Sequence, residues 1–169
     1  MRDRDDGKRV TIAGIALLAA AAAAAAEPTN ADIAFVQAVA QSGAAEIALS
    51  RLAADAAHSA AIRSFARQML QEHARSNDAL SGIAMREKIP FPADPDNAHA
   101  ALARDLANLH GTPFDRRYLQ AMQDDHHRLA ALLRSAQTSV GDPRLQEFIA
   151  QTLPVVEAHA GMADRLRVE

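Results

Sequence analysis

The chain has 169 residues, a formal net charge of -3 and 49% hydrophobic residues, which is enough for one domain with a sizeable core. Cysteine is absent, and this excludes disulfides, thiolate metal sites and cysteine nucleophiles. No basic patch or acidic tail stands out, so we expect no nucleic-acid partner. Aromatic residues make up only 4%, while alanine and leucine are abundant, and this balance predicts an all-α protein.

The N-terminal segment predicts a signal peptide. Residues 1–9 contain four basic side chains, and residues 10–26 are uncharged and end in an alanine run before Glu27-Pro28. We expect cleavage after Ala26, because a signal peptidase needs small residues there. The alternative is a retained anchor, but the apolar run is 17 residues, mostly alanine, and a bilayer-spanning helix needs roughly 20.

The predicted organisation is therefore a signal peptide at residues 1–26 and one domain at residues 27–169. We expect no second apolar run after the signal peptide. The mature protein is predicted to be periplasmic or extracellular, with no stable membrane insertion. Its protein partner and oligomeric state are not indicated by the sequence.

Four amphipathic segments predict the long helices of a bundle, because apolar residues recur in each at three- and four-residue spacing. The predicted helices end near residues 58, 87 and 139, and the fourth contains Pro154, which predicts a kink. Their expected N-caps are Thr29 or Asn30, Ser59, Thr112 and Asp142.

Residues 88–113 differ in composition, with three prolines followed by a short amphipathic stretch at residues 97–109. We interpret this segment as a crossover that joins two helical pairs. Two pairs and one long crossover predict a ferritin-like antiparallel four-helix bundle with a short helix in the crossover.

Three histidines lie on the apolar stripes of three different predicted helices, namely His73, His126 and His159. Glu46 lies on the stripe of the first helix, although that stripe is mostly alanine and serine and Glu46 is the weakest member of the set. Imidazole and carboxylate groups that converge in a bundle core suit zinc, iron, manganese or copper. We predict that these four residues bind one divalent metal ion. The alternative is a polar network that fixes helix register without any metal.

Several other polar residues lie close in sequence to the predicted ligands. Glu72 and Asp125 each precede a stripe histidine, and we expect them to support the ligands as hydrogen-bond partners or to face solvent. Asn77 lies four residues after His73 and is expected to hydrogen-bond within the site. The remaining histidines are interpreted as surface residues: His58, His99, His110 and His127.

The chain resembles the exported bacterial proteins of the domain-of-unknown-function family numbered forty-one forty-two, which are often labelled outer membrane or exported proteins. The matching segments are residues 35–53, Phe65 to Met69 with Glu72-His73 and Asn77, Phe114-Asp115 with Tyr118, Met122 with Asp125-His126, and Thr152 to Pro154 with His159. The resemblance implies a ferritin-like fold and a location outside the cytoplasm, and it implies no established activity.

These observations leave three functions open. The first and favoured one is an exported binding or stress-related helical module, whose interior polar cluster holds one metal ion or small ligand or is structural. The second is a ferritin-like oxidase, but neither Glu72 nor Glu157 has a histidine three residues later, as the di-iron pattern requires. The third is a purely structural or interaction protein. No catalytic residue is predicted.

Overall fold

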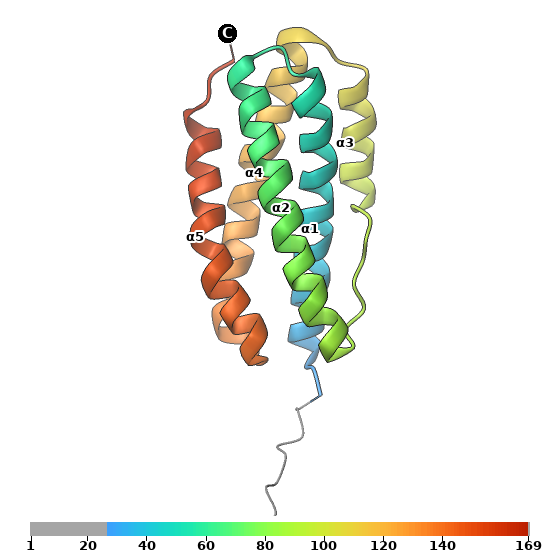
Figure 1. Ribbon diagram of the computed structural model, residues 1–169, viewed down its shortest axis with the longest axis vertical. Coiled ribbons are helices and arrows are strands. Elements are labelled where there is room, and N and C mark those ends of the chain that lie inside the picture. Colours follow the sequence, from blue (N-terminus) through green and yellow to red (C-terminus); the bar gives the residue numbers. More distant parts are fainter. Residues whose placement is uncertain (1–26, 169) are drawn as a thin grey trace, which may run out of the picture.

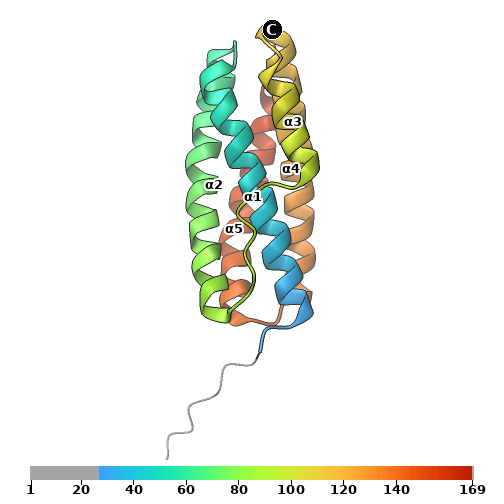
Figure 2. The ribbon, with the colours of Figure 1, turned by 90° about the vertical axis from the view of Figure 1, so that its right-hand side faces the viewer.

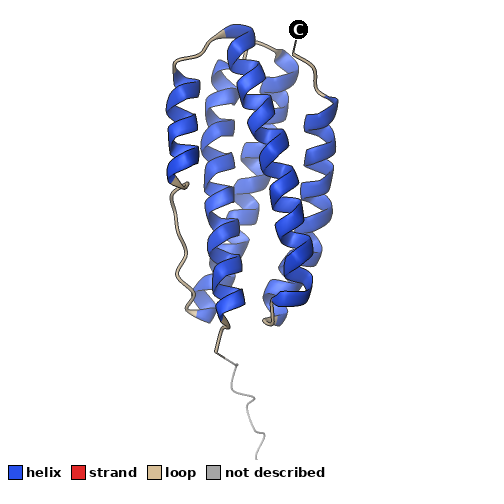
Figure 3. Cartoon of the chain, turned by 180° about the vertical axis from the view of Figure 1, so that it is seen from behind, coloured by secondary structure: helices blue, strands red, loops and turns tan. Residues whose placement is uncertain are grey.

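The computed structural model describes residues 27–168, so the predicted signal peptide and its cleavage after Ala26 lie outside the described residues. Within this part of the chain all regular structure is helical (Figure 3). The helices are α1 (Asn30–Ala56), α2 (Ala60–Glu87), α3 (Asn97–Ala107), α4 (Gly111–Ser139) and α5 (Pro143–Arg165). The all-α prediction is confirmed.

The four long helices form an antiparallel bundle of two pairs, α1 with α2 and α4 with α5 (Figure 1). α1 and α5 run in one direction, and α2 and α4 run in the other. The segment after α2 passes across α1 and leads into α3, which packs against α1 and α4 (Figure 2). This connection is the single crossover of a ferritin-like bundle and confirms the predicted topology.

The N-cap positions follow the prediction with one exception, although Ser59 at the N-cap of α2 makes no capping hydrogen bond with its side chain. The side chains of Thr29 and Asp142 accept hydrogen bonds from backbone N–H groups of the first turn, and Thr29 forms a full capping box with Asp32. α4, however, begins at Gly111 with His110 as its N-cap, so the predicted cap at Thr112 lies inside the helix. The helix starts earlier because Pro113 is tolerated anywhere in the first turn, where no N–H partner is needed.

Two buried aspartates tie each helical pair to the turn of the other pair. Asp115 of α4 accepts hydrogen bonds from the N–H groups of His58 and Ser59, at 2.8 and 2.7 Å, in the turn between α1 and α2. Asp32 of α1 accepts hydrogen bonds from Gly141 and Asp142, at 2.9 and 3.2 Å, in the turn between α4 and α5. The two turns lie at opposite ends of the bundle, so the pairs are fastened at both ends (Figure 1).

α1 corrects the expectation of no second apolar run. An 18-residue window of this helix has a mean hydropathy of 1.2, which is long and apolar enough to cross a membrane by length and composition alone. A helix at the centre of a bundle passes the same test, and 56% of the window is buried against the other helices. The apolar face of α1 is therefore already used inside the protein.

The apolar core is divided into two clusters, one toward each end of the bundle. The first contains Leu80 and Leu133 with neighbours from all four long helices, and the second contains Met69 and Met122 with their neighbours. Along each long helix the sequence passes from one cluster to the other. The layer between them is where the predicted polar residues lie.

His99 of α3 is not the surface residue that the sequence suggested. Its side chain is only 19% exposed, and its ring bridges Asp96 at 2.9 Å and Asp125 of α4 at 3.2 Å. Asp125 also forms an ion pair with Arg128. Burial alone would lower the pKa of His99, but the hydrogen bonds to Asp125 and Asp96 outweigh burial and raise it. The protonated form of His99 is therefore favoured, and its contacts with Asp96 and Asp125 fasten the crossover to α4.

We expect the stability contributed by His99 to depend on pH. A raised folded-state pKa gives stability that is fully present below the unfolded value of about 6.5 and is lost as pH rises through the folded-state pKa. His99→Ala should lower the free energy of unfolding by about 1–3 kcal/mol at pH 5.5, because it removes charge-assisted hydrogen bonds. The difference from wild type should shrink toward pH 9, as measured by urea unfolding at both pH values. A difference that stays constant or grows with pH would contradict the ion-pair role.

Candidate metal centre

The candidate site lies in the layer between the two apolar clusters and takes one residue from each long helix. Glu46, His73, His126 and His159 come from α1, α2, α4 and α5, and all four side chains are buried. On each helix, apolar residues three to seven positions before and after the polar residue belong to the two apolar clusters. Helical periodicity therefore holds the polar side chain in the same inward direction.

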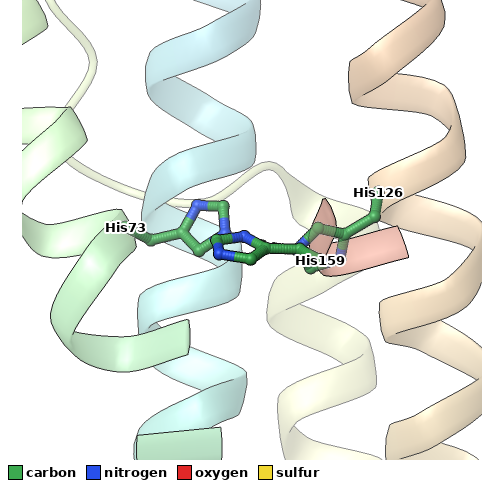
Figure 4. A group of neighbouring side chains, drawn as sticks. All are labelled: His73, His126 and His159. Carbon is green, nitrogen blue, oxygen red and sulfur yellow. The ribbon is translucent and has the colours of Figure 1, made fainter. Parts of the chain in front are cut away.

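The three imidazoles form a nearly equilateral triangle in the middle of the bundle (Figure 4). The ring centroids are 5.3 Å apart for His73 and His126, and 5.4 Å for each ring to His159. One ligand atom from each ring can be chosen so that all three lie within 4.8 Å of one another. The structure thus brings together the three histidines that the sequence singled out.

Glu46 of α1 completes this group. Its Oε2 atom lies 2.6 Å from Nε2 of His73 and 3.3 Å from Nε2 of His126, and its side chain is 0% exposed. Neither carboxylate oxygen has a well-oriented hydrogen bond to another group of the described chain. A buried carboxylate without hydrogen bonds is costly unless a positive charge is nearby. The weakest member of the predicted set is therefore buried with the three histidines.

The histidines beside Glu46 can supply the positive charge that its carboxylate needs. Burial alone would raise the pKa of Glu46, but the charges of His73 and His126 outweigh burial and lower it to about 2. Burial likewise would lower the pKa of His73, but the Glu46 charge and hydrogen bonding raise it. His159 differs, since burial and the two neighbouring histidines lower its pKa. These effects favour an ionised Glu46 beside a protonated His73, and they favour the neutral form of His159.

Hydrogen bonds outside the triangle fix which nitrogen of two rings faces the centre. Nδ1 of His126 donates to the backbone carbonyl of Met122 at 2.8 Å, which leaves Nε2 for the interior. Nε2 of His159 donates to Oε2 of Glu72 at 2.6 Å, and Nδ1 of His159 is buried without a partner. Backbone carbonyls and carboxylates hold metal-binding histidines in this same manner.

The other predicted supporting residues lie farther out. Glu72 is one-third exposed and contacts His159, as the expectation for a supporting residue requires. Asp125 is buried, but its contacts are His99 and Arg128, and no contact joins it to the three histidines among the described residues. Its position one residue before His126 turns it about 100° around the helix, toward α3.

Asn77 is placed beside Gly43 of α1, and no hydrogen bond joins it to the histidines in the described chain. A Cβ atom at Gly43 would lie 2.6 Å from Oδ1 and 3.1 Å from Cγ of Asn77. Glycine is therefore needed at this position for α1 and α2 to pack closely, three residues before Glu46. Sequence spacing could not reveal this contact, because it depends on the rotation of two helices relative to each other.

The donor atoms lie near the separations that a single metal ion needs. Ligands about 2.1 Å from a tetrahedral ion lie about 3.4 Å from one another. Nε2 of His73 lies 3.3 Å from Nε2 of His126, and the latter lies 3.3 Å from Oε2 of Glu46. Nε2 of His73 lies closer to Oε2 of Glu46, at 2.6 Å, and the ligand atoms of the three histidines lie within 4.8 Å of one another. Three imidazoles and one carboxylate could therefore hold one ion after small shifts of their side chains.

Comparison with known proteins gives a family and a fold. A family model described as "Domain of unknown function (DUF4142)" matches residues 17–166. A search of curated proteins gives no match. Among solved structures, "CopM in the Cu(II)-bound form" is similar with a TM-score of 0.67 and 17% sequence identity, covering 79% of this chain and 93% of that chain. At this identity the likeness shows the fold.

The close contact between Gly43 and Asn77 predicts an energetic coupling. Gly43→Ala alone gains helix propensity but forces the Asn77 side chain to move, whereas in an Asn77→Ala background the same change meets no obstacle and should stabilise by about 0.5–1 kcal/mol. A double-mutant cycle measured by urea unfolding should give a coupling free energy of about 1 kcal/mol. Strict additivity would mean that the helices do not approach as closely as described.

Proposed function

We propose that this chain, which belongs to the DUF4142 family, is a helical-bundle protein that binds one divalent metal ion between its four long helices. The observation that carries this proposal is the convergence of three buried imidazoles with the buried carboxylate of Glu46, whose oxygens make no well-oriented hydrogen bond although one lies 2.6 Å from His73. A bound cation would supply the charge that this carboxylate requires.

The chemistry of the donors narrows the choice of ion. Imidazole nitrogen suits zinc, copper, iron and nickel, whereas magnesium and calcium prefer sites made of oxygen atoms. The structurally similar protein is described as bound to Cu(II). Copper and zinc are therefore the first ions to test. Affinity should depend on pH, because an incoming metal ion must displace protons from the histidines.

In this proposal the residues have distinct tasks. His73, His126, His159 and Glu46 are the ligands, with a bound ion replacing the proton now shared between His73 and Glu46. Met122 O and Glu72 orient the rings of His126 and His159 through their second nitrogens. The apolar clusters above and below exclude water from the layer. The site binds or stores a metal ion, and no residue is assigned a catalytic role.

One alternative function is supported by a specific observation. His73 and Glu46 are already paired at 2.6 Å without any ion, so the layer is consistent with a polar network that fixes helix register. The di-iron oxidase is less well supported, because the described carboxylates that contact these histidines are Glu46 and Glu72, and neither is part of a Glu-x-x-His pair.

We also propose that the protein acts outside the cytoplasm, after cleavage behind Ala26. The support is the charged and then apolar N-terminal sequence. The mass of the protein recovered from the periplasm of an expressing bacterium would test this proposal, with a mature chain that begins at Glu27 as the expected result.

Metal content is the direct test of the proposed site. The mature protein, purified without chelator or histidine tag and dialysed against Cu²⁺ or Zn²⁺, should retain one ion per chain. His73→Ala should lose that ion, and His127→Ala should keep it, because His127 is an exposed histidine beside His126. At a free metal concentration one hundred times Kd, the free energy of unfolding should rise by about 2.7 kcal/mol.

Circular dichroism of both variants serves as the control for folding. Equal metal content in folded His73→Ala and His127→Ala proteins would rule out the proposed ligands. Absence of bound metal from the wild type, together with lower stability of His73→Ala, would favour the structural network.

Glu72 provides a graded test of the same site. Glu72→Gln keeps the shape of the side chain but weakens the hydrogen bond that holds His159, so metal affinity should fall by about 10–100-fold while one ion per chain is still bound at saturation. The matched control is Asp78→Asn, which changes an exposed carboxylate on the same helix. Competition with a chromophoric chelator measures both affinities, and equal values would mean that Glu72 does not support the ligand.

A further inference from the structure

A groove of about 310 Å³ runs along the seam between α2 and α5 and reaches the candidate metal centre. One end of it is formed by Glu72, His73 and His159, and the other by Ala79 and Phe148. With a rise of 1.5 Å per residue, these ends are about 9 Å apart along α2 and about 16 Å apart along α5. The groove is thus elongated, with its polar end at two of the proposed metal ligands.

The wall of the groove is apolar and partly open to solvent. Phe148, Val155 and Val156 are the large apolar residues that line the α5 side. Val155 is 43% exposed and is one of only two large apolar residues that are exposed in the described chain. An exposed apolar side chain inside a concave groove, with polar groups gathered at one end, is typical of a binding site for a small organic molecule.

The charges around the groove favour an anion. Arg75 lines the groove and is exposed, and none of the ion pairs found in the described chain involves it. Glu72 opposes an anion, but its carboxylate accepts the hydrogen bond of His159. With a divalent ion bound, the ion and Arg75 together exceed the carboxylates of Glu46 and Glu72 by one positive charge.

We propose that the groove between α2 and α5 binds a small organic anion with an extended apolar body, whose head lies at the polar end beside the metal centre and whose tail runs toward Phe148. This inference rests on the proposed metal site and names the class of ligand that the site receives. The apolar walls select for the body, and the net positive charge selects for the head. A short aliphatic carboxylate has this chemistry, and octanoate is a chain of suitable length.

The experiment titrates octanoate and acetate into the ¹⁵N-labelled mature protein, with and without Zn²⁺, and follows the backbone amides by NMR. Octanoate should shift amides along the groove, including those of Val155 and Phe148, with about tenfold higher affinity in the zinc-loaded protein than in the metal-free protein. Acetate has the same head without the body, so it should bind more weakly by about tenfold or more, which corresponds to about two buried methylene groups.

Two matched variants separate the groove from a general surface effect. Ala79 lies at the tail end of the groove, in an exposed position remote from the metal ligands. Ala79→Trp should fill this end and lower the affinity for octanoate by about tenfold or more. Ala131→Trp places the same side chain on an exposed position of α4 and should leave octanoate affinity unchanged. Folding of both is checked by circular dichroism.

Shifts confined to other surfaces, or equal octanoate affinity of the two tryptophan variants, would overturn the groove as a binding site. Equal affinity of the wild type with and without zinc would overturn the placement of the head at the metal. Zinc content of the same samples is measured separately. Zinc that is bound without any groove shift therefore overturns this inference alone, whereas retention of neither zinc nor copper overturns the proposed function.

Discussion

The burial of one negative charge is the constraint on which the bundle depends. Glu46 has no contact with solvent and lies against the imidazoles of two other helices. Such a charge is stable only beside a positive charge, whether a proton on His73 or a metal ion. The three rings must therefore stay at one level of the bundle. This requirement fixes the register of α2, α4 and α5 relative to α1 and divides the apolar core into two clusters.

The long helices, the crossover and the inward histidines were predictable because they depend on local periodicity. His73, His126 and His159 each have apolar neighbours at three- or four-residue spacing, so their direction follows from the helix itself. Glu46 was the weakest prediction, since alanine and serine around it do not distinguish a buried face from an exposed one. Its buried position is set by the packing of α1 against three other helices.

Other features depend on contacts between distant residues and gave no usable signal in the sequence. His99 lies in the crossover among polar residues, which is typical of an exposed side chain, yet Asp125 of α4 and Asp96 enclose it. Asn77 was expected at the histidines and instead lies against Gly43. Both positions depend on the rotation of one helix about its axis.

The crossed hydrogen bonds of Asp32 and Asp115 bear on how the chain reaches this structure. Each hairpin of two helices has exposed amide groups in its own turn, and the acceptor for them is a carboxylate on the other hairpin. Half of the molecule on its own would thus keep a frayed turn and an uncovered apolar face. The hairpins are consequently not autonomous folding units. They complete each other, and the polar layer at mid-height can assemble only after both have docked.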